Sequence, residues 1–256
     1  GIMKKLLAIT ALSAALFFGQ TAVAEEKAAE EVKPSHVEMV LVLDESGSMS
    51  DLTRDTIGGF NSMIEKEKKL DVDAHVTTVL FNDQYKMLYN RRELKDVSKM
   101  TDKDYTPGGM TALLDAVGRT IHKMDMVAGI HRKDKGNKVL FVIITDGEEN
   151  DSKEYTYADV KKLIKDRQEN AGWEFIFLGA NIDAAAAAEN LGIDRDRAVK
   201  YKNTGSGVRA NFKAVAELSD SLAKSGRVSD RWKETVEKDE DDAADKQSAA
   251  VTSHRR

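Results

Sequence analysis

The chain has 256 residues, a formal net charge of −5 and no cysteine. This length suits one domain of ordinary to large size with a sizeable core and terminal extensions. The lack of cysteine excludes disulfides, thiolate zinc sites and cysteine nucleophiles, and an acidic balance without a strongly basic block argues against nucleic-acid binding.

The first 24 residues predict a secretory signal peptide. Met3-Lys4-Lys5 is a charged start, Leu6 to Phe18 is apolar, and Ala22-Val23-Ala24 is a small-residue cleavage pattern. Gly1-Ile2 precede this segment and are interpreted as a cloning remnant. The apolar segment is shorter than the roughly 20 residues of a membrane span. We therefore expect cleavage after Ala24 and a secreted or periplasmic bacterial protein with no stable membrane span; the alternative is a cytoplasmic protein with an incidentally apolar N-terminus.

The stretch from Val37 to Ser48, VEMVLVLDESGS, begins with apolar and β-branched residues and ends in Asp44, Ser46 and Ser48. An apolar run bounded by polar turn residues is typical of a strand buried on both faces of a parallel sheet. The three oxygen-bearing side chains stand at every second position and are expected to face one way from the following loop. Such oxygen ligands suit a hard divalent cation, Mg²⁺ or Mn²⁺. The stretch therefore predicts a metal site.

Strands and helices alternate along the rest of the chain. The expected elements are helices at 52–69, from 113 to about 128, at 156–170, 184–191 and 208–224, and strands at 74–81, 138–145, 173–179 and 198–201, with a short antiparallel edge strand at 86–90. This alternation predicts an α/β fold with a doubly wound, mainly parallel central sheet, helices on both faces and right-handed crossovers. Gly58-Gly59, inside the first helix, predict close packing of that helix on the sheet.

Three motifs resemble those of the von Willebrand factor type A (vWA) family. Asp44-Glu45-Ser46-Gly47-Ser48 is similar to the family's D-x-S-x-S motif. Pro107 to Leu113 is similar to the family's Thr-containing helix start, and Phe141 to Gly147 to its later strand ending in Asp. The motifs occur in the family's order, and the resemblance spans roughly residues 37–224. It implies a Rossmann-like vWA fold and a metal-ion-dependent adhesion site formed by Asp44, Ser46, Ser48, Thr111 and Asp146.

The resemblance implies cation-dependent recognition of a protein rather than turnover. In the family, the hydroxyls typically bind the cation directly, and the acids bind it directly or through water. Two carboxylates only balance a divalent charge, so an open position remains for an Asp or Glu of a partner. We expect a monomeric, non-enzymatic domain that holds Mg²⁺ or Mn²⁺ and binds such a protein ligand. Asp44 and Asp146 follow predicted strands, where α/β sheets bind ligands.

Three alternatives remain open. Asp44, Ser46 and Thr111 could merely cap helices, and Asp146-Gly147 could form a simple turn. The domain could be a metal-dependent phosphohydrolase on a similar sheet, although Ser46 stands where that chemistry needs a second Asp, and neither Gly-x-Ser-x-Gly nor Gly-Lys-Ser/Thr occurs. It could also be a scaffold whose metal site is vestigial.

Charged segments flank the expected domain at 37–224. Residues 25–36 read as a flexible leader and residues 225–256 as a charged, largely disordered tail in which Trp232 could dock locally. Glu148 to Asp151 is interpreted as a solvated loop and Asp183 as a helix cap. The five histidines show no paired ligand spacing, and none is assigned a role.

Overall fold

The computed structural model describes residues 35–127, 130, 133 and 136–239. The predicted signal peptide and nearly all of the predicted leader lie outside the described residues, as do residues 240–256 of the tail. Within the described part of the chain, no helix is long and apolar enough to cross a membrane.

Six strands form one sheet in the order β3-β2-β1-β4-β5-β6. They are β1 (His36–Asp44), β2 (Ala74–Phe81), β3 (Tyr85–Glu93), β4 (Asn137–Thr145), β5 (Glu174–Gly179) and β6 (Ala198–Lys200). Only the edge strand β3 runs antiparallel to its neighbour. The predicted doubly wound α/β fold is therefore confirmed, and the edge strand is longer than predicted.

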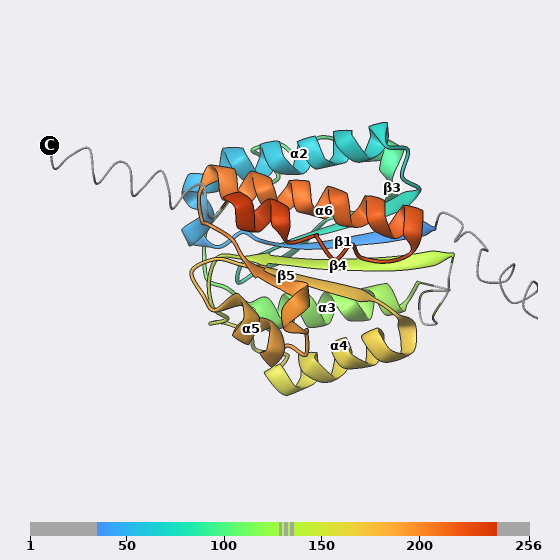
Figure 1. The fold of residues 1–256 in the computed structure, drawn as a ribbon. Coiled ribbons are helices and arrows are strands. Elements are labelled where there is room, and N and C mark those ends of the chain that lie inside the picture. Colours follow the sequence, from blue (N-terminus) through green and yellow to red (C-terminus); the bar gives the residue numbers. More distant parts are fainter. Residues whose placement is uncertain (1–34, 128–129, 131–132, 134–135, 240–256) are drawn as a thin grey trace, which may run out of the picture. The chain divides into compact units, whose positions relative to one another are not determined.

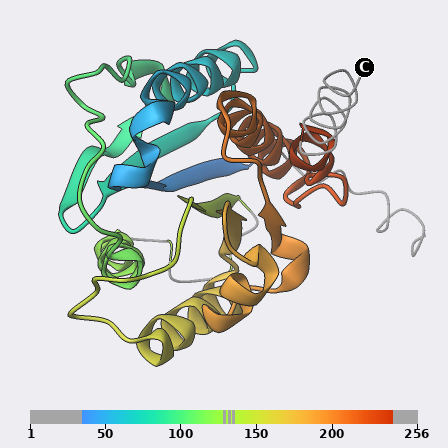
Figure 2. The same ribbon diagram turned by 90° about the vertical axis from the view of Figure 1, so that its left-hand side faces the viewer.

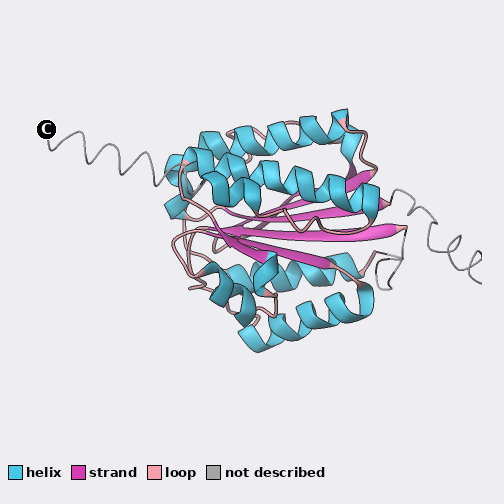
Figure 3. Cartoon of the chain, in the orientation of Figure 1, coloured by secondary structure: helices cyan, strands magenta, loops and turns pink. Residues whose placement is uncertain are grey.

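Helices cover both faces of the sheet (Figure 1, Figure 3). On one face lie α2 (Thr53–Lys69) and α6 (Gly205–Ser225), and on the other α3 (Leu113–Asp125), α4 (Tyr157–Ala171) and α5 (Ala184–Asn190). Figure 2 shows the two layers with the sheet between them. Successive side chains of β1 point to opposite faces. Met39 and Leu41 therefore join one apolar core, and Val40 and Val42 the other.

The strand order places a topological switch point between β1 and β4. From β1 the chain continues through α2 to β2 on one side, whereas β4 continues through α4 to β5 on the other. Ligands of α/β sheets bind at the carboxyl ends of strands that diverge in this way. Asp44 is the last residue of β1, and Asp146 directly follows β4. The fold therefore brings the two acids to the same edge.

Gly59 permits close packing of α2 against α6. A Cβ atom at Gly59 would come within 2.7 Å of the Phe212 ring, whereas one at Gly58 would meet nothing within 4 Å. The prediction that these glycines allow α2 to pack closely on the sheet is therefore wrong about what Gly59 contacts. The close neighbour is a second helix, because α2 and α6 lie side by side on one face of the sheet.

The packed region continues beyond α6. Val228, Trp232 and Val236 are buried in the same core as α6, and the Trp232 Nε1 donates a hydrogen bond to the Asp196 carbonyl oxygen at 3.0 Å. Residues 234–239 of this segment are helical. The packed region thus includes residues that the sequence analysis placed in the tail.

Candidate functional site

Asp44 is held rigidly at the end of β1. Its Oδ1 accepts a hydrogen bond from the Ser46 backbone N–H at 2.7 Å, and its Oδ2 accepts one from the Thr145 hydroxyl at 2.8 Å. The Tyr105 hydroxyl donates to the Asp44 carbonyl oxygen at 2.6 Å. The Asp44 residue is only 2% exposed. The carboxylate is therefore fixed in direction, and the chain turns back towards it at Ser46.

Ser46, Ser48 and Asp146 complete a connected cluster with Asp44. The hydroxyl oxygens of Ser46 and Ser48 are 3.1 Å apart, and the Ser48 hydroxyl donates to Asp146 Oδ1 at 2.8 Å. The Asp146 backbone N–H points to Asp44 Oδ2 at 3.4 Å. Asp146 is buried and Ser48 is exposed. The structure thus brings together four of the five predicted site residues, with one serine at the opening to solvent.

Thr111 lies in a loop that packs on this cluster through the backbone. The Gly47 N–H donates to the Gly109 carbonyl oxygen at 3.1 Å, and the Gly108 N–H donates to that of Glu45 at 3.0 Å. Gly109 has φ +74°, and a Cβ atom there would clash with Asp83, so this approach requires glycine. Thr111 is buried. Within the described residues, no hydrogen bond joins its hydroxyl to the other four side chains.

Helix capping does not account for Ser46 or Thr111. Ser46 precedes the 3-10 helix Gly47–Leu52 without a capping hydrogen bond from its side chain, and the N-cap of α3 is Ala112 rather than Thr111. By contrast, Thr156 caps α4 and Asp183 caps α5 through their side-chain oxygens. The interpretation of Asp183 as a helix cap is therefore confirmed, whereas the described residues show no capping bond from the Ser46 side chain, and Thr111 precedes the N-cap of α3.

Two buried acids lie together here without a counter-charge. In the described part of the chain, neither Asp44 nor Asp146 forms an ion pair with a Lys, Arg or His side chain. Burial, together with the neighbouring Asp146 charge, raises the pKa of Asp44 above its ordinary value. Uncompensated buried charge is costly, and hydroxyl and carboxylate oxygens are the ligands that hard divalent cations prefer. The donor set therefore fits Mg²⁺ or Mn²⁺.

Further side chains around the cluster were missed by sequence reasoning. The Asn203 Nδ2 donates to Asp146 Oδ2 at 3.2 Å. Among the described residues the buried Tyr201 hydroxyl has no hydrogen-bond partner. Its burial, with the charges of Asp146 and Asp44, raises its pKa well above the usual value. Both residues lie between β6 and α6, so nothing local connects them to the motifs. Thr145, in contrast, precedes Asp146 in the strand and could have been noticed.

The loop after β4 is tied to α3 rather than simply solvated. Glu149 Oε2 accepts a hydrogen bond from the Leu114 N–H at 3.2 Å, and Asn150 Oδ1 accepts one from the Thr111 N–H at 2.8 Å. These bonds hold the amino-terminal end of α3 and the Thr111 loop against the end of β4. Residues 148–151 form a loop as predicted, with Glu148 and Asn150 exposed, and the side chains of Glu149 and Asn150 also accept backbone hydrogen bonds.

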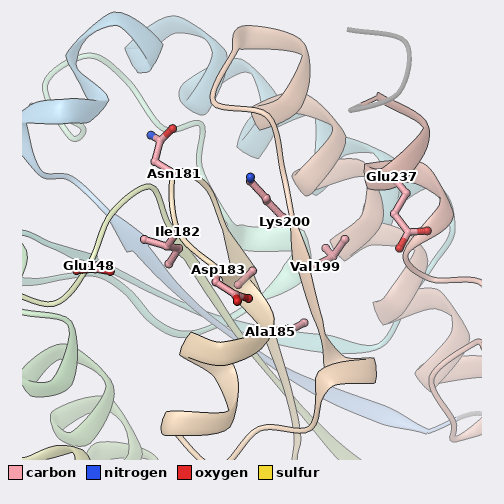
Figure 4. A pocket seen from close by; sticks show the side chains of 10 residues that line it. Glu148, Asn181, Ile182, Asp183, Ala185, Val199, Lys200 and Glu237 are labelled. Atoms are coloured by element: carbon pink, nitrogen blue, oxygen red, sulfur yellow. The ribbon is translucent and has the colours of Figure 1, made fainter. Parts of the chain in front are cut away.

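A pocket of about 800 Å³ is lined by residues that follow β4 and β5 and by residues of β6, and Figure 4 shows the side chains of its wall. Its wall includes Asn181, whose Nδ2 donates to the Asp146 carbonyl oxygen at 3.2 Å. Acidic and basic side chains also line it, among them Asp183, Lys200 and Glu237. Small-molecule sites are mostly apolar. The lining of this pocket is divided evenly between polar or charged residues and small or apolar ones, Ile182, Val199 and three alanines.

Comparisons with known proteins agree with this architecture. The family vWA-TerF-like, described as the vWA found in the TerF C terminus, matches residues 36–192. No curated protein sequence matches the chain. The open conformation of the pilus adhesin SpaC from Lactobacillus rhamnosus GG aligns with a TM-score of 0.59 and 14% identity, over 75% of this chain and 30% of the adhesin.

Two further solved structures share the fold. The vWF domain of the type V pili tip protein Mfa5 from Porphyromonas gingivalis aligns with a TM-score of 0.53 and 12% identity, over 77% of this chain and 99% of that domain. A von Willebrand factor type A protein from Catenulispora acidiphila aligns with a TM-score of 0.51 and 15% identity, over 73% of this chain and 43% of that one. This chain spans less than a third of SpaC. At these identities the likeness concerns the fold.

Proposed function

Because this chain belongs to the vWA-TerF-like family, we propose that it is a protein-binding domain whose recognition depends on a divalent cation. Its metal-ion-dependent adhesion site comprises Asp44, Ser46, Ser48, Thr111 and Asp146, and the fitting ions are Mg²⁺ and Mn²⁺. The observation that carries the proposal is the pair of buried acids, Asp44 and Asp146, beside two serine hydroxyls and without a counter-charge among the residues that the structure describes. Metal binding would supply the missing positive charge.

In the proposed site the acidic residues supply negative charge, and the hydroxyl residues supply neutral oxygen ligands. Asp44 and Asp146 offer two negative charges, which balance a divalent cation and no more. Ser46, Ser48 and Thr111 offer neutral oxygens, so the bound cation would remain attractive to a further carboxylate. Ser48 is the exposed member of the cluster. A partner's Asp or Glu would therefore approach from the Ser48 side.

Protein recognition is favoured over catalysis by the surroundings of the cluster. Asp44 and Asp146 accept hydrogen bonds from Thr145, Ser48 and Asn203, which orient them as fixed acceptors. The mixed-charge pocket next to Asn181 offers polar contacts for a protein surface. The pilus proteins with this fold are described as an adhesin and a tip protein. We therefore propose a non-enzymatic, monomeric domain that meets its partner after secretion or in the periplasm.

Thermal unfolding of the whole chain with Mg²⁺, Mn²⁺, Ca²⁺ or EDTA tests the metal site. An ion at about 100 times its dissociation constant should stabilise the fold by roughly 2.7 kcal/mol. Asp44→Ala should abolish that shift, whereas Asp51→Ala, which removes an exposed acid outside the cluster, should keep it. Unchanged unfolding with every ion at millimolar concentration would contradict the proposed metal site.

Matched peptides test the proposed partner chemistry. A surface-bound peptide that presents a single Asp should bind the chain in Mg²⁺ and release it in EDTA, and its Asn counterpart should bind weakly in both. Equal binding of the two peptides would contradict recognition of a carboxylate. Hydrolysis of an aryl phosphate by the wild type, lost in Asp44→Ala, would instead identify the chain as a phosphohydrolase.

A further inference from the structure

A second cluster of side chains that can bind metals lies at the opposite edge of the sheet, where β1 and β2 begin. β1 begins at His36 and ends at Asp44, so eight steps of about 3.3 Å separate the two edges by roughly 26 Å. Parallel pairing of β1 with β2 sets Glu38 opposite His75. His36 and His75 are 39 residues apart in sequence. Spacing along the sequence does not mark these histidines as a pair, because only the strand pairing brings them together.

Three donor atoms of this cluster form a compact triangle. His36 Nε2 is 2.9 Å from His75 Nδ1 and 3.3 Å from Glu38 Oε1, and His75 Nδ1 is 3.2 Å from the same Glu38 oxygen. Zinc–ligand bonds of about 2.0–2.1 Å place neighbouring atoms of a tetrahedral shell about 3.3–3.4 Å apart. The triangle therefore matches one face of such a tetrahedron after only small adjustments.

Neighbouring side chains orient two of the three ligands. His36 Nδ1 lies 3.1 Å from Asp73 Oδ1, and a carboxylate on one ring nitrogen fixes the histidine and directs the other nitrogen to a metal. Glu38 is 1% exposed and is held by the Arg91 guanidinium, whose Nε donates to Oε2 at 3.2 Å. Another guanidinium nitrogen of Arg91 donates to Oε1 and lies 3.4 Å from His75 Nδ1.

Arg91 reaches Glu38 from an irregular point of β3. The β2–β3 pairing shifts between Val76 and Thr78, and Arg91, opposite this shift, has φ +44°. Bulges of this kind redirect side chains, and a left-handed conformation is strained for a residue other than glycine. The strain accompanies the placement of one positive charge on Glu38, which leaves its carboxylate fixed in direction.

Charge and access both allow a cation here. With neutral imidazoles, Glu38 and Asp73 carry two negative charges against one positive charge on Arg91. The side chains of His36 and His75 are 21% and 28% exposed. They line a pocket of about 470 Å³ whose wall also includes Asp71 and Asp73. A cation can therefore reach the triangle, and its remaining coordination position would face that pocket.

We propose that His36, Glu38 and His75 form a binding site for a transition-metal cation of the Zn²⁺ class. Imidazole nitrogens favour such ions over Mg²⁺. This selectivity makes the site chemically distinct from the oxygen-lined cluster at Asp44. A cation bound here joins the starts of β1 and β2 and offers its open position to water or to a partner's side chain.

The test is titration of the metal-stripped full-length chain with Zn²⁺, followed by the visible absorption of bound Co²⁺ as a signature of nitrogen ligation. His36→Ala and His75→Ala should each weaken Zn²⁺ binding by more than the roughly 10–100-fold expected for Asp73→Asn, which removes only the orienting carboxylate. Arg91→Gln should tighten binding, because it removes a competing positive charge. His122→Ala, which removes an exposed histidine on α3, should leave the Zn²⁺ affinity unchanged.

Circular dichroism of each variant must match that of the wild type, and the partly exposed His36 and His75 make this attainable. Zn²⁺ affinity that is unchanged in both His36→Ala and His75→Ala would overturn the proposal. So would a folded wild-type chain that binds no Zn²⁺ at micromolar concentration. The cluster would then be an ion-pair network that only joins three strands.

Discussion

Each end of β1 buries a carboxylate, equally deeply, but the pKa values of the two carboxylates shift in opposite directions. Glu38 is 1% exposed and Asp44 is 2% exposed. Burial, with the nearby charge of Asp146, raises the pKa of Asp44. Burial alone would also raise the pKa of Glu38, but hydrogen bonding with His36 and Arg91 lowers it to about 2. The partners of a buried acid, and not its depth, therefore decide whether the acid is stable as an anion.

The difference has a functional consequence at each edge. Glu38 is already balanced by Arg91, so a cation bound there must be attracted mainly by imidazole nitrogens. Asp44 and Asp146 have no such balance within the described residues, and a hard cation would relieve their mutual repulsion. One strand thus presents a nitrogen-rich cluster at its start and an oxygen-rich cluster at its end.

The largest expected effect concerns a buried acid that has neither an ion-pair partner like that of Glu38 nor a place in the proposed cation site of Asp44. Glu67 on α2 is fully buried, and neither of its oxygens has a hydrogen-bond partner within the described residues. Its burial raises the pKa from 4.5 to about 8. The folded state thus holds a proton that the unfolded chain releases. The free energy of unfolding should therefore fall as the pH rises from 4.5 to 8, by up to about 5 kcal/mol, and level off above.

Urea unfolding of the wild type and Glu67→Gln at pH 5 and pH 8 measures this dependence. The glutamine variant keeps the shape of the side chain and cannot ionise, so most of the fall with pH should disappear. If the free energy of unfolding changed equally with pH in the two proteins, the Glu67 charge would be compensated in the folded state. Glu67 would then not be an example of a buried acid without partners.

Glu38→Gln should give the next largest effect. The substitution leaves the Arg91 guanidinium without the carboxylate that it grips, and it should destabilise the metal-free fold by about 2–3 kcal/mol. Glu93→Gln, which removes an exposed acid paired with Lys95, should change stability by less than about 0.5 kcal/mol. Denaturant unfolding in EDTA compares the two variants. If both substitutions lowered the stability equally little, the Arg91 ion pair would not stabilise Glu38 as proposed.

The two edges should also separate by their ions. Stabilisation by Mg²⁺, about 2.7 kcal/mol at 100 times its dissociation constant, should vanish in Asp146→Ala and persist in His75→Ala. Stabilisation by Zn²⁺ should show the reverse pattern. Thermal unfolding of the two variants with each ion measures this. A single variant that abolishes both responses would mean that the clusters do not act independently.

Asp146→Asn should give the smallest effect, and it should be stabilising. The amide oxygen keeps an acceptor for Ser48 and the charge that faces Asp44 is removed, but the amide nitrogen then faces the Asn203 Nδ2 donor, so the metal-free fold should gain less than about 1 kcal/mol. Calorimetry in EDTA compares the variant with the wild type, and Asp51→Asn is the matched surface control. A loss of stability would show that the Asp146 charge is already compensated.

Local patterns in the sequence determined most of the fold. The bounds of β2 at Ala74–Phe81 were predicted without change, and Asp183 caps α5 as its position before a run of alanines indicated. Apolar periodicity and capping depend on residues close in sequence, so they can be identified one segment at a time. The motifs around Asp44 and Asp146 were recognised for the same reason, and the alternation of elements placed both at carboxyl ends of parallel strands.

Tertiary structure alone decided what meets across the chain. The pairing of β1 with β2 unites His36 with His75, and the docking of α6 on α2 brings Phe212 against Gly59. The return of the chain after β6 places Asn203 on Asp146. Strand register and helix docking depend on apolar burial summed over the whole domain. They therefore cannot be inferred from the residues of one segment. The sequence therefore identified the residues that meet at the carboxyl ends of β1 and β4, and only the assembled sheet created the cluster at the opposite ends of the strands.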